Sequence, residues 1–220
     1  MSLDAVLFDL DGTLVDSEPV WELAVVALAE HLGARVSAPA LAATLGVSQR
    51  ASVRIVFADI GMPLDRASID AGNELLTAFA KRGFARGVPW RPGAAELLSD
   101  VGAAGVPRAL VTSADRVLVE LALKTVGREH FGAIVCGDEV DGRTKPDPAP
   151  YVMAAQRLGV NPAACVAVED SAPGVVSARL AGCVVVAVPR AGITLQPGPR
   201  TVVLESLRGV SVDFLRATVG

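Results

Sequence analysis

The chain has 220 residues, of which 51% are hydrophobic and 20% are charged, so it can bury a full core and is not disordered as a whole. Its net charge is -4, and no run of lysine and arginine stands out, which argues against a nucleic-acid partner. The most apolar stretch, Leu180–Pro189, is far shorter than the about 20 residues that a membrane-spanning helix needs, so no membrane partner is expected.

The beginning of the chain gives no sign of export, because it carries acidic residues and no basic region. The three cysteines are far apart, and none forms a CxxC pair, so a zinc site is not expected. Each cysteine lies in or beside an apolar run, as small buried thiols in a reducing compartment do. We therefore expect a cytoplasmic protein that is a monomer or a weak homo-oligomer.

Short apolar runs rich in β-branched residues alternate with helix-like segments. The predicted strands are Ala5–Leu10, Arg108–Thr112, Ala133–Cys136, Cys165–Val168, Val184–Val188 and, more weakly, Thr201–Leu204. The predicted helices among them are Ala114–Gly127, Pro148–Gly159 and Ala172–Ala181, and a last one covers Ser211–Val219. Because the strands are continuously apolar, both of their faces should be covered. The alternation predicts an α/β fold with a doubly wound parallel sheet.

One stretch interrupts this alternation, because residues 16–90 contain no convincing buried strand. Helical segments are expected there at Ser17–Gly33, Pro39–Leu45, Gln49–Ile60 and Asp65–Arg82. Glycine and proline residues then mark the return to the α/β pattern. The sequence therefore predicts two domains, an α/β core of residues 1–15 and 91–220 and an inserted helical domain of residues 16–90.

The first predicted strand runs into the acidic sequence FDLDGT at residues 8–13. Ligands of open α/β sheets bind at the carboxyl ends of the strands, so Asp9 and Asp11 stand where chemistry is expected. Residues two apart in an extended segment point the same way, and two converging carboxylates are tolerable when a cation lies between them. Gly12 permits a sharp turn and a close approach of the backbone.

Other predicted strand ends and a loop also carry polar residues. Thr112 and Ser113 offer a hydroxyl and backbone N–H groups to a phosphate oxygen. Lys145, one of only three lysines, lies in a proline-rich loop, where it can serve as a fixed positive charge for phosphate. Glu169 and Asp170 follow a further apolar strand, where acids are costly unless they bind a hard cation through oxygen.

With acids, hydroxyl, lysine and acids again in this order, the sequence resembles the haloacid dehalogenase superfamily, in its phosphatase and phosphomutase branch. FDLDGTLVDS corresponds to the family's first motif, LVTS to its second, KPDP to its third and VEDS to its fourth. The likeness covers nearly the whole chain. Residues 16–90 resemble the helical cap of the subfamily in which the cap follows the first motif.

The resemblance implies a reaction and assigns roles. Asp9 would be the nucleophile that forms an aspartyl-phosphate, and Asp11 would be the general acid and base. Thr112, the Ser113 N–H and Gly12 would surround the phosphoryl group. An aspartate at position 11 favours phosphoryl transfer over dehalogenation.

The resemblance also implies a Mg²⁺ cofactor. Asp9, the Asp11 carbonyl oxygen and Asp170 would bind the ion, with Glu169 acting mainly through water. Lys145 would neutralise charge on the nucleophile and on the phosphate. The expected partner is a small phosphorylated metabolite, and the sequence Asp-Ser-Glu-Pro-Val-Trp at residues 16–21 is similar to that of phosphatases acting on sugar phosphates.

The cap of this subfamily closes over the site and selects the substrate. Candidate selectors are Glu18, Trp21, Gln49, Arg50 and Arg54, of which Gln49 and Arg50 are assigned to substrate binding.

Two other functions share parts of this pattern with hydrolysis. A β-phosphoglucomutase shares the core and the cap, but the positions of its cap His, Arg and Lys correspond here to Val20, Gln49 and the Leu75–Leu76 region. A phospho-accepting signalling module also uses acids, a hydroxyl and a lysine, but it has a different motif order and no helical insert. The main prediction is a phosphatase, with a phosphomutase as the alternative.

Overall fold

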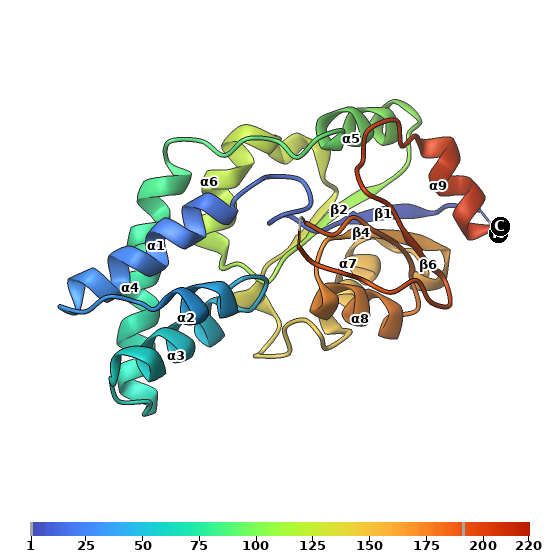
Figure 1. Ribbon diagram of the computed structural model, residues 1–220. Helices are drawn as coiled ribbons and strands as arrows, with labels where there is room; N and C mark the ends of the chain where they lie inside the picture. The colour runs from blue at the N-terminus through green and yellow to red at the C-terminus, as the bar shows by residue number, and fades with distance from the viewer. Residues whose placement is uncertain (1, 191) are drawn as a thin grey trace. The chain divides into compact units, whose positions relative to one another are not determined.

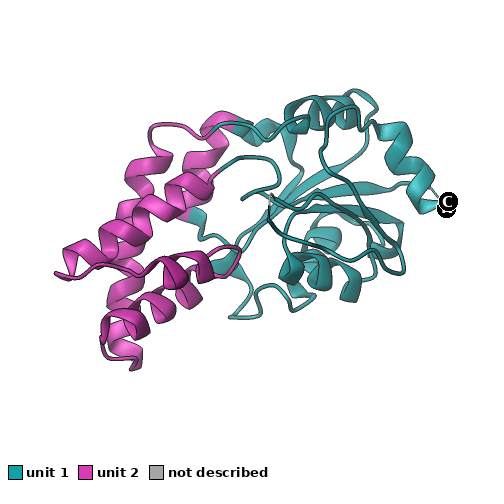
Figure 2. Ribbon diagram, in the orientation of Figure 1, with its two compact units in different colours: residues 1–16, 89–116, 126–220 teal, residues 17–88, 117–125 magenta. Residues whose placement is uncertain are grey.

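A computed structural model describes residues 2–190 and 192–220. The contacts between residues divide the chain into two compact units (Figure 2). The first unit extends to Asp16 and continues with residues 89–116 and 126–220. The second unit contains residues 17–88 and also residues 117–125, which lie within the α/β core predicted from the sequence.

The first unit is built on a six-stranded parallel sheet with the order β3-β2-β1-β4-β5-β6 (Figure 1). The strands are β1 (Ala5–Phe8), β2 (Arg108–Val111), β3 (Ala133–Val135), β4 (Cys165–Glu169), β5 (Val184–Ala187) and β6 (Thr201–Val203). The weakest predicted strand, β6, pairs with β5 at the edge of the sheet. The doubly wound parallel α/β fold predicted from the sequence is confirmed.

Helices cover both faces of this sheet. On one face α7 (Ala149–Leu158) packs on β1, β2 and β3, and α8 (Ala172–Leu180) packs on β4 and β5. Figure 1 shows α5 (Ala94–Ala103) and α9 (Val212–Val219) on the other side, and α9 contacts both β4 and α5. The helix α6 (Arg116–Val126) crosses the boundary between the units, and single 3₁₀ turns lie at Arg128–His130, Gly137–Glu139 and Pro162–Ala164.

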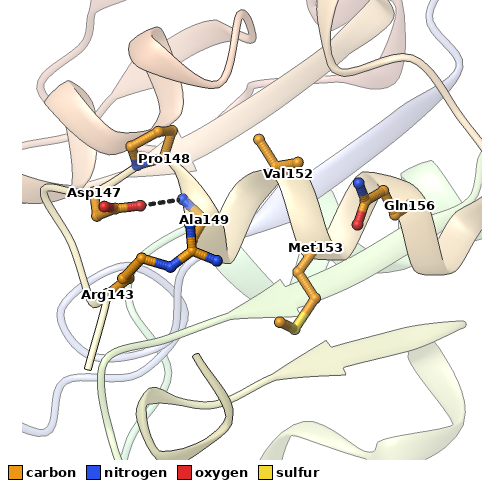
Figure 3. A pocket seen from close by; sticks show the side chains of 7 residues that line it. All are labelled: Arg143, Asp147, Pro148, Ala149, Val152, Met153 and Gln156. Carbon is orange, nitrogen blue, oxygen red and sulfur yellow. Dashed lines mark hydrogen bonds between the residues drawn. The ribbon is translucent and has the colours of Figure 1, made fainter. Parts of the chain in front are cut away.

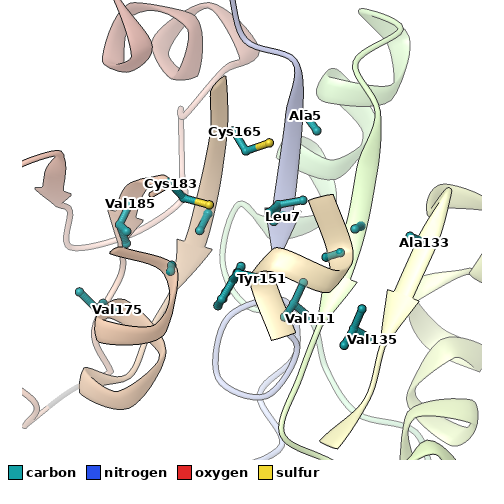
Figure 4. Packing of buried hydrophobic residues seen from close by; sticks show 14 of the residues in the cluster. Ala5, Leu7, Val111, Ala133, Val135, Tyr151, Cys165, Val175, Cys183 and Val185 are labelled. Atoms are coloured by element: carbon teal, nitrogen blue, oxygen red, sulfur yellow. The ribbon is translucent and has the colours of Figure 1, made fainter. Parts of the chain in front are cut away.

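The core of the first unit explains why the strand sequences are continuously apolar. Leu7 of β1, Val111 of β2 and Val185 of β5 belong to one buried cluster with Tyr151 of α7 (Figure 4). Their strand neighbours on the opposite face, such as Phe8, are equally buried. Both faces of each strand are therefore removed from water, as in other parallel sheets covered by helices.

Helix α5 was not predicted from the sequence. Gly93 is its N-cap in a left-handed conformation, with φ of 84°, and no side chain caps the helix. A residue with a Cβ at position 93 would also overlap the backbone of Leu207 and Arg208. The start of α5 thus depends on close chain packing and carries none of the usual Ser or Asp capping signal.

Residues 17–88 of the second unit form four helices, as the sequence predicted for this stretch. They are α1 (Glu18–His31), α2 (Ala38–Ala43), α3 (Gln49–Ile60) and α4 (Arg66–Phe84). Ser37, Ser48 and Asp65 cap α2, α3 and α4 with their side chains. Helix α1 packs along α4, where Trp21 meets Phe84 edge to face at 5.9 Å between ring centroids.

The next two findings concern the cysteine side chains and the lengths of the helices. Cys136, Cys165 and Cys183 are free and buried, and burial raises the pKa of each thiol to about 12. Within residues 2–190 and 192–220, no helix combines the length and the hydropathy that crossing a membrane requires.

Candidate active site

Strand register brings the first acidic motif beside the last one. Phe8 of β1 pairs with Leu110 of β2 on one side and with Val168 of β4 on the other. Asp9, the next residue, is held by a hydrogen bond of 3.0 Å from its N–H to the Val168 carbonyl oxygen. The polar residues that follow these central strands are therefore collected at one edge of the sheet, where parallel strands end together.

Lys145 reaches this edge from the loop before α7 and is almost fully buried, with 5% of its side chain exposed. Its ammonium group donates to Asp9 Oδ1 at 2.6 Å, to Glu169 Oε1 at 2.5 Å and to the Val111 carbonyl oxygen at 2.9 Å. An ammonium group has three protons, so each has an acceptor. Lys145 thus joins the ends of β1, β2 and β4 through one charge.

Asp170 lies on the other side of the acidic cluster. Its Oδ2 is 2.7 Å from Nε of Arg190, a residue of the segment after β5 that is also mostly buried. A Cβ at Gly12 would overlap Asp170 Oδ2 and touch the Arg190 side chain, and Gly12 has a φ of 85°. Only glycine meets both the conformational and the spatial demand at position 12.

The second motif meets the first at Asp11. Thr112 Oγ1 lies 3.4 Å from Asp11 Oδ2 and accepts a hydrogen bond of 3.0 Å from the Ala114 N–H. Ser113, between Thr112 and Ala114, is partly buried, and a Cβ at Gly137 would overlap its carbonyl oxygen. The structure thus brings Asp9, Asp11 and Thr112 to one place with Lys145.

Burial dominates the electrostatics of this cluster. It raises the pKa of Asp9 to about 7, with Lys145 opposing the shift and Glu169 adding to it. Burial also raises the pKa of Asp170 well above its usual value, and the charges of Asp9 and Glu169 increase the effect. Lys145 loses solvation as well, but the two carboxylates beside it outweigh that loss and raise its pKa. The lysine is therefore a permanent cation.

The donor set fits a hard divalent cation. Asp9, Glu169 and Asp170 each offer a carboxylate oxygen within 4.8 Å of the others, and all three are buried. Buried carboxylates this close repel one another, which adds to the rise that burial causes in the pKa values of Asp9 and Asp170. An ion such as Mg²⁺, which prefers oxygen ligands, would relieve this repulsion.

The two substrate-binding residues expected in the insert lie at the start of α3 and contact α4. Gln49 Nε2 donates to the Asn73 carbonyl oxygen at 3.2 Å and to Thr77 Oγ1 at 2.5 Å. Arg50 Nη1 lies 2.5 Å from Asp70 Oδ1. Both side chains are thus used in the packing of the second unit.

A separate pocket of about 210 Å³ lies along the outer side of α7 (Figure 3). It is lined by Arg143, Asp147, Pro148, Ala149, Val152, Met153 and Gln156. None of the residues predicted to take part in catalysis lines it. The Asp147 carboxylate is used locally, since it accepts a hydrogen bond of 2.8 Å from the Ala149 N–H.

Sequence reasoning missed two side chains that contact the cluster. Arg190 follows the apolar run of β5, so the rule that polar residues at strand ends mark the site could have found it. Tyr151 donates a hydrogen bond of 2.6 Å to Glu169 Oε1 from inside α7. The sequence indicates Tyr151 more weakly. A buried tyrosine hydroxyl needs a hydrogen-bond partner, but this need alone does not say which residue the partner is.

Comparison with known proteins identifies the class. Residues 3–182 match the model of the haloacid dehalogenase-like hydrolases, and the chain belongs to this family. The family predicted from the four motifs is therefore confirmed, and the chain is an enzyme of the phosphatase kind.

Two curated relatives and one solved structure show where the chain falls within the family. Hexitol phosphatase A of Escherichia coli strain K12 is 35% identical over 217 residues, which cover 96% of this chain and 95% of the relative. A phosphorylated carbohydrates phosphatase of Thermotoga maritima is 31% identical, with 82% of each chain covered. The crystal structure of CbbY from Rhodobacter sphaeroides in complex with phosphate has a TM-score of 0.85 at 25% identity, covering 97% of this chain and 99% of that one.

Proposed function

We propose that this enzyme is a Mg²⁺-dependent phosphatase that hydrolyses a small sugar or polyol phosphate through an aspartyl-phosphate on Asp9. The observation that carries the proposal is the buried contact of Lys145 with Asp9, in the carboxylate cluster that also contains Glu169 and Asp170. The kinship with a hexitol phosphatase and a carbohydrate phosphatase supports the substrate class, a hexitol phosphate first among its members. The inserted helical unit would act as the cap.

In the first half of the reaction, a carboxylate oxygen of Asp9 attacks phosphorus, and the bond from phosphorus to the ester oxygen breaks. Asp11 gives its proton to the departing alkoxide, which leaves as the free alcohol. In the second half, water attacks the phosphorus of the aspartyl-phosphate, and Asp11 takes the proton of that water. Inorganic phosphate leaves and the Asp9 carboxylate is restored.

The remaining side chains supply position and charge. Lys145 stays protonated and balances the negative charge that gathers on Asp9 and the phosphoryl oxygens. Thr112 and the Ser113 N–H would hold those oxygens. Asp9, the Asp11 carbonyl oxygen and Asp170 would hold Mg²⁺, with Glu169 reached through water. When bound, the ion would neutralise phosphoryl charge and fix the orientation of the ester.

The proposal is tested with two variants and a panel of phosphate esters that includes hexitol phosphates. Asp9→Asn should abolish both turnover and covalent incorporation of phosphate. Asp11→Asn should keep Mg²⁺ binding, because only its backbone carbonyl is a ligand, while turnover falls by about 10²–10⁴. Released phosphate is measured with and without Mg²⁺. Robust turnover by Asp9→Asn would remove Asp9 as nucleophile.

Phosphomutase activity is the second candidate, and the second unit argues against it. Leu76 is fully buried, Val20 packs against Gly83 and Gln49 bonds to α4, so none of these positions supplies a cation. Arg50 is a cation, but it is paired with Asp70. A mutase needs positive groups to grip the second phosphate of its intermediate.

A further inference from the structure

Glu169 is held on every side by the protein. Its Oε1 accepts hydrogen bonds from Lys145 and Tyr151, and its Oε2 accepts from the Asp170 N–H at 3.2 Å and from Ser171 Oγ at 3.2 Å. A Cβ at Gly174 would overlap the carboxylate, so the absence of a side chain there makes room for it. Glu169 is fully buried. Such a carboxylate has one position and can fix the groups bonded to it.

Tyr151 contacts both members of the Glu169–Lys145 ion pair. Its hydroxyl donates to Glu169 Oε1 at 2.6 Å, and its ring centroid lies 5.2 Å from the Lys145 ammonium. Tyr151 is fully buried in the apolar cluster between α7 and the sheet (Figure 4). Burying a hydroxyl among apolar groups is costly unless it is hydrogen-bonded, and a phenylalanine would fill the same space without that cost.

We propose that Tyr151 is a positioning residue for Lys145. The hydroxyl fixes Glu169 Oε1, and the carboxylate together with the ring fixes the ammonium group against Asp9. Of the three acceptors of Lys145, the Val111 carbonyl belongs to the backbone and Asp9 is the proposed nucleophile. Glu169 is therefore the side-chain acceptor that can hold the ammonium group in place throughout the reaction. This inference rests on the proposed role of Lys145 at Asp9.

The first test uses Tyr151→Phe, which removes the hydroxyl and keeps the ring. Loss of a hydrogen bond that orients a functional group costs about 10–100-fold in activity, so kcat should fall by about tenfold or more. KM should stay nearly unchanged, because Tyr151 has no proposed contact with the substrate. A residue that only fills the core would lose stability and keep its kcat.

The control is Cys165→Ala, at the opposite end of β4 from Glu169. It also removes a buried donor from the same cluster, since Cys165 Sγ lies 3.3 Å from the Asn161 carbonyl oxygen. Thermal unfolding should show a loss of stability in both variants. Only Tyr151→Phe should lose kcat.

The second test asks whether Tyr151 acts through Lys145, with a readout that needs no turnover. Binding of orthovanadate in the presence of Mg²⁺ is measured by calorimetry for the wild type, Tyr151→Phe, Lys145→Met and the double variant. Tyr151→Phe alone should weaken binding by about tenfold, the lower end of the usual range for such support. In the Lys145→Met background it should have no further effect, because the group that it positions is gone.

Two results would overturn the inference. One is an unchanged kcat in Tyr151→Phe. The other is an additive loss of orthovanadate binding in the double variant. Failure of the proposed function would look different, because the wild type itself would then release no phosphate from any ester of the panel.

Discussion

At the scale of single residues, the site is a problem of charge balance. The site contains a cluster of three carboxylates, those of Asp9, Glu169 and Asp170. Two cations, Lys145 and Arg190, contact this cluster. These five side chains include one more carboxylate than cation. Before a metal ion or a phosphate arrives, the folded chain therefore holds an excess negative charge in a buried place once all three carboxylates are ionised, which should reduce its stability.

This excess predicts how the metal-free protein responds to pH. Burial raises the pKa of Asp9 from its ordinary value of 3.8 to about 7, so between these values the folded state binds more protons than the unfolded state. Unfolding free energy should therefore fall as pH rises from about 4 to about 7. Asp9→Asn should reduce this dependence, to which Asp170 also contributes, and should stabilise the metal-free protein at pH 8 by about 1–3 kcal/mol. Urea unfolding in EDTA across this pH range measures both effects.

Glu205→Gln is the control for this experiment, because it removes an exposed carboxylate of the same charge. It should change neither the slope nor the stability at pH 8. If Asp9→Asn destabilised the metal-free protein at pH 8, its ion pair with Lys145 would outweigh its burial, and the charge-balance argument would fail.

Lys145 and Asp170 belong to the same cluster, but substitutions at the two positions should affect different steps, turnover in one case and Mg²⁺ binding in the other. Asp170→Ala removes an oxygen ligand and should weaken Mg²⁺ binding, so that more Mg²⁺ is needed for half-maximal activity. Lys145→Ala should lower kcat by about 10²–10³, the usual cost of one electrostatic group aimed at developing charge, and should leave Mg²⁺ affinity near that of the wild type. Calorimetric Mg²⁺ titration beside steady-state kinetics separates them. The reverse pattern would exchange the two roles.

At the scale of helices and strands, the sequence was informative wherever a local rule fixed the outcome. Continuous apolar runs predicted every strand, and α3 begins and ends where Gln49–Ile60 was predicted. The predicted segments Asp65–Arg82 and Ala172–Ala181 begin within one residue of α4 and α8, and the structure shows Asp65 and Ser171 as the caps of these helices. Helix α5 was not predicted, because its start depends on packing against Leu207, which is far along the chain.

In the site, too, local sequence patterns could be read from the sequence, while contacts made by tertiary packing could not. The order of acids, hydroxyl and lysine at strand ends predicted which residues would gather, because a parallel sheet brings these ends to one edge. The pattern could not give the partners that arrive from elsewhere. Arg190 and Tyr151 reach the cluster only through tertiary packing, from the segment after β5 and from the inside of α7.

Helix α8 yields a prediction that runs against helix propensity. Replacing a glycine by alanine within a helix usually stabilises it by about 1 kcal/mol. Gly174→Ala should instead destabilise the protein by about 1–3 kcal/mol, since the new methyl group would overlap the Glu169 carboxylate. In the control, Gly102→Ala, the three atoms nearest to the methyl group would all belong to the end of the flexible Arg108 side chain. Urea unfolding compares the two, and equal stabilities would contradict the prediction.

At the scale of the whole molecule, the two units divide the work that we propose. The α/β unit carries the residues assigned to phosphoryl transfer, and these belong to motifs that hydrolases and phosphomutases share. The choice of phosphoryl acceptor would then depend on the helical unit. A mutase must hold a bisphosphorylated intermediate while it reorients, which requires cationic side chains that face the second phosphate.

The helical unit predicts that water, and not a sugar hydroxyl, is the acceptor. Val20 and Leu76 are apolar, Gln49 is neutral, and Arg50 is paired with Asp70 at 2.5 Å. Incubation with Mg²⁺, β-glucose 1-phosphate and a trace of glucose 1,6-bisphosphate should therefore release inorganic phosphate and form little glucose 6-phosphate. The bisphosphate should not be needed for activity. Rapid isomer formation by the wild type, with negligible phosphate release, would overturn the hydrolase and favour the mutase.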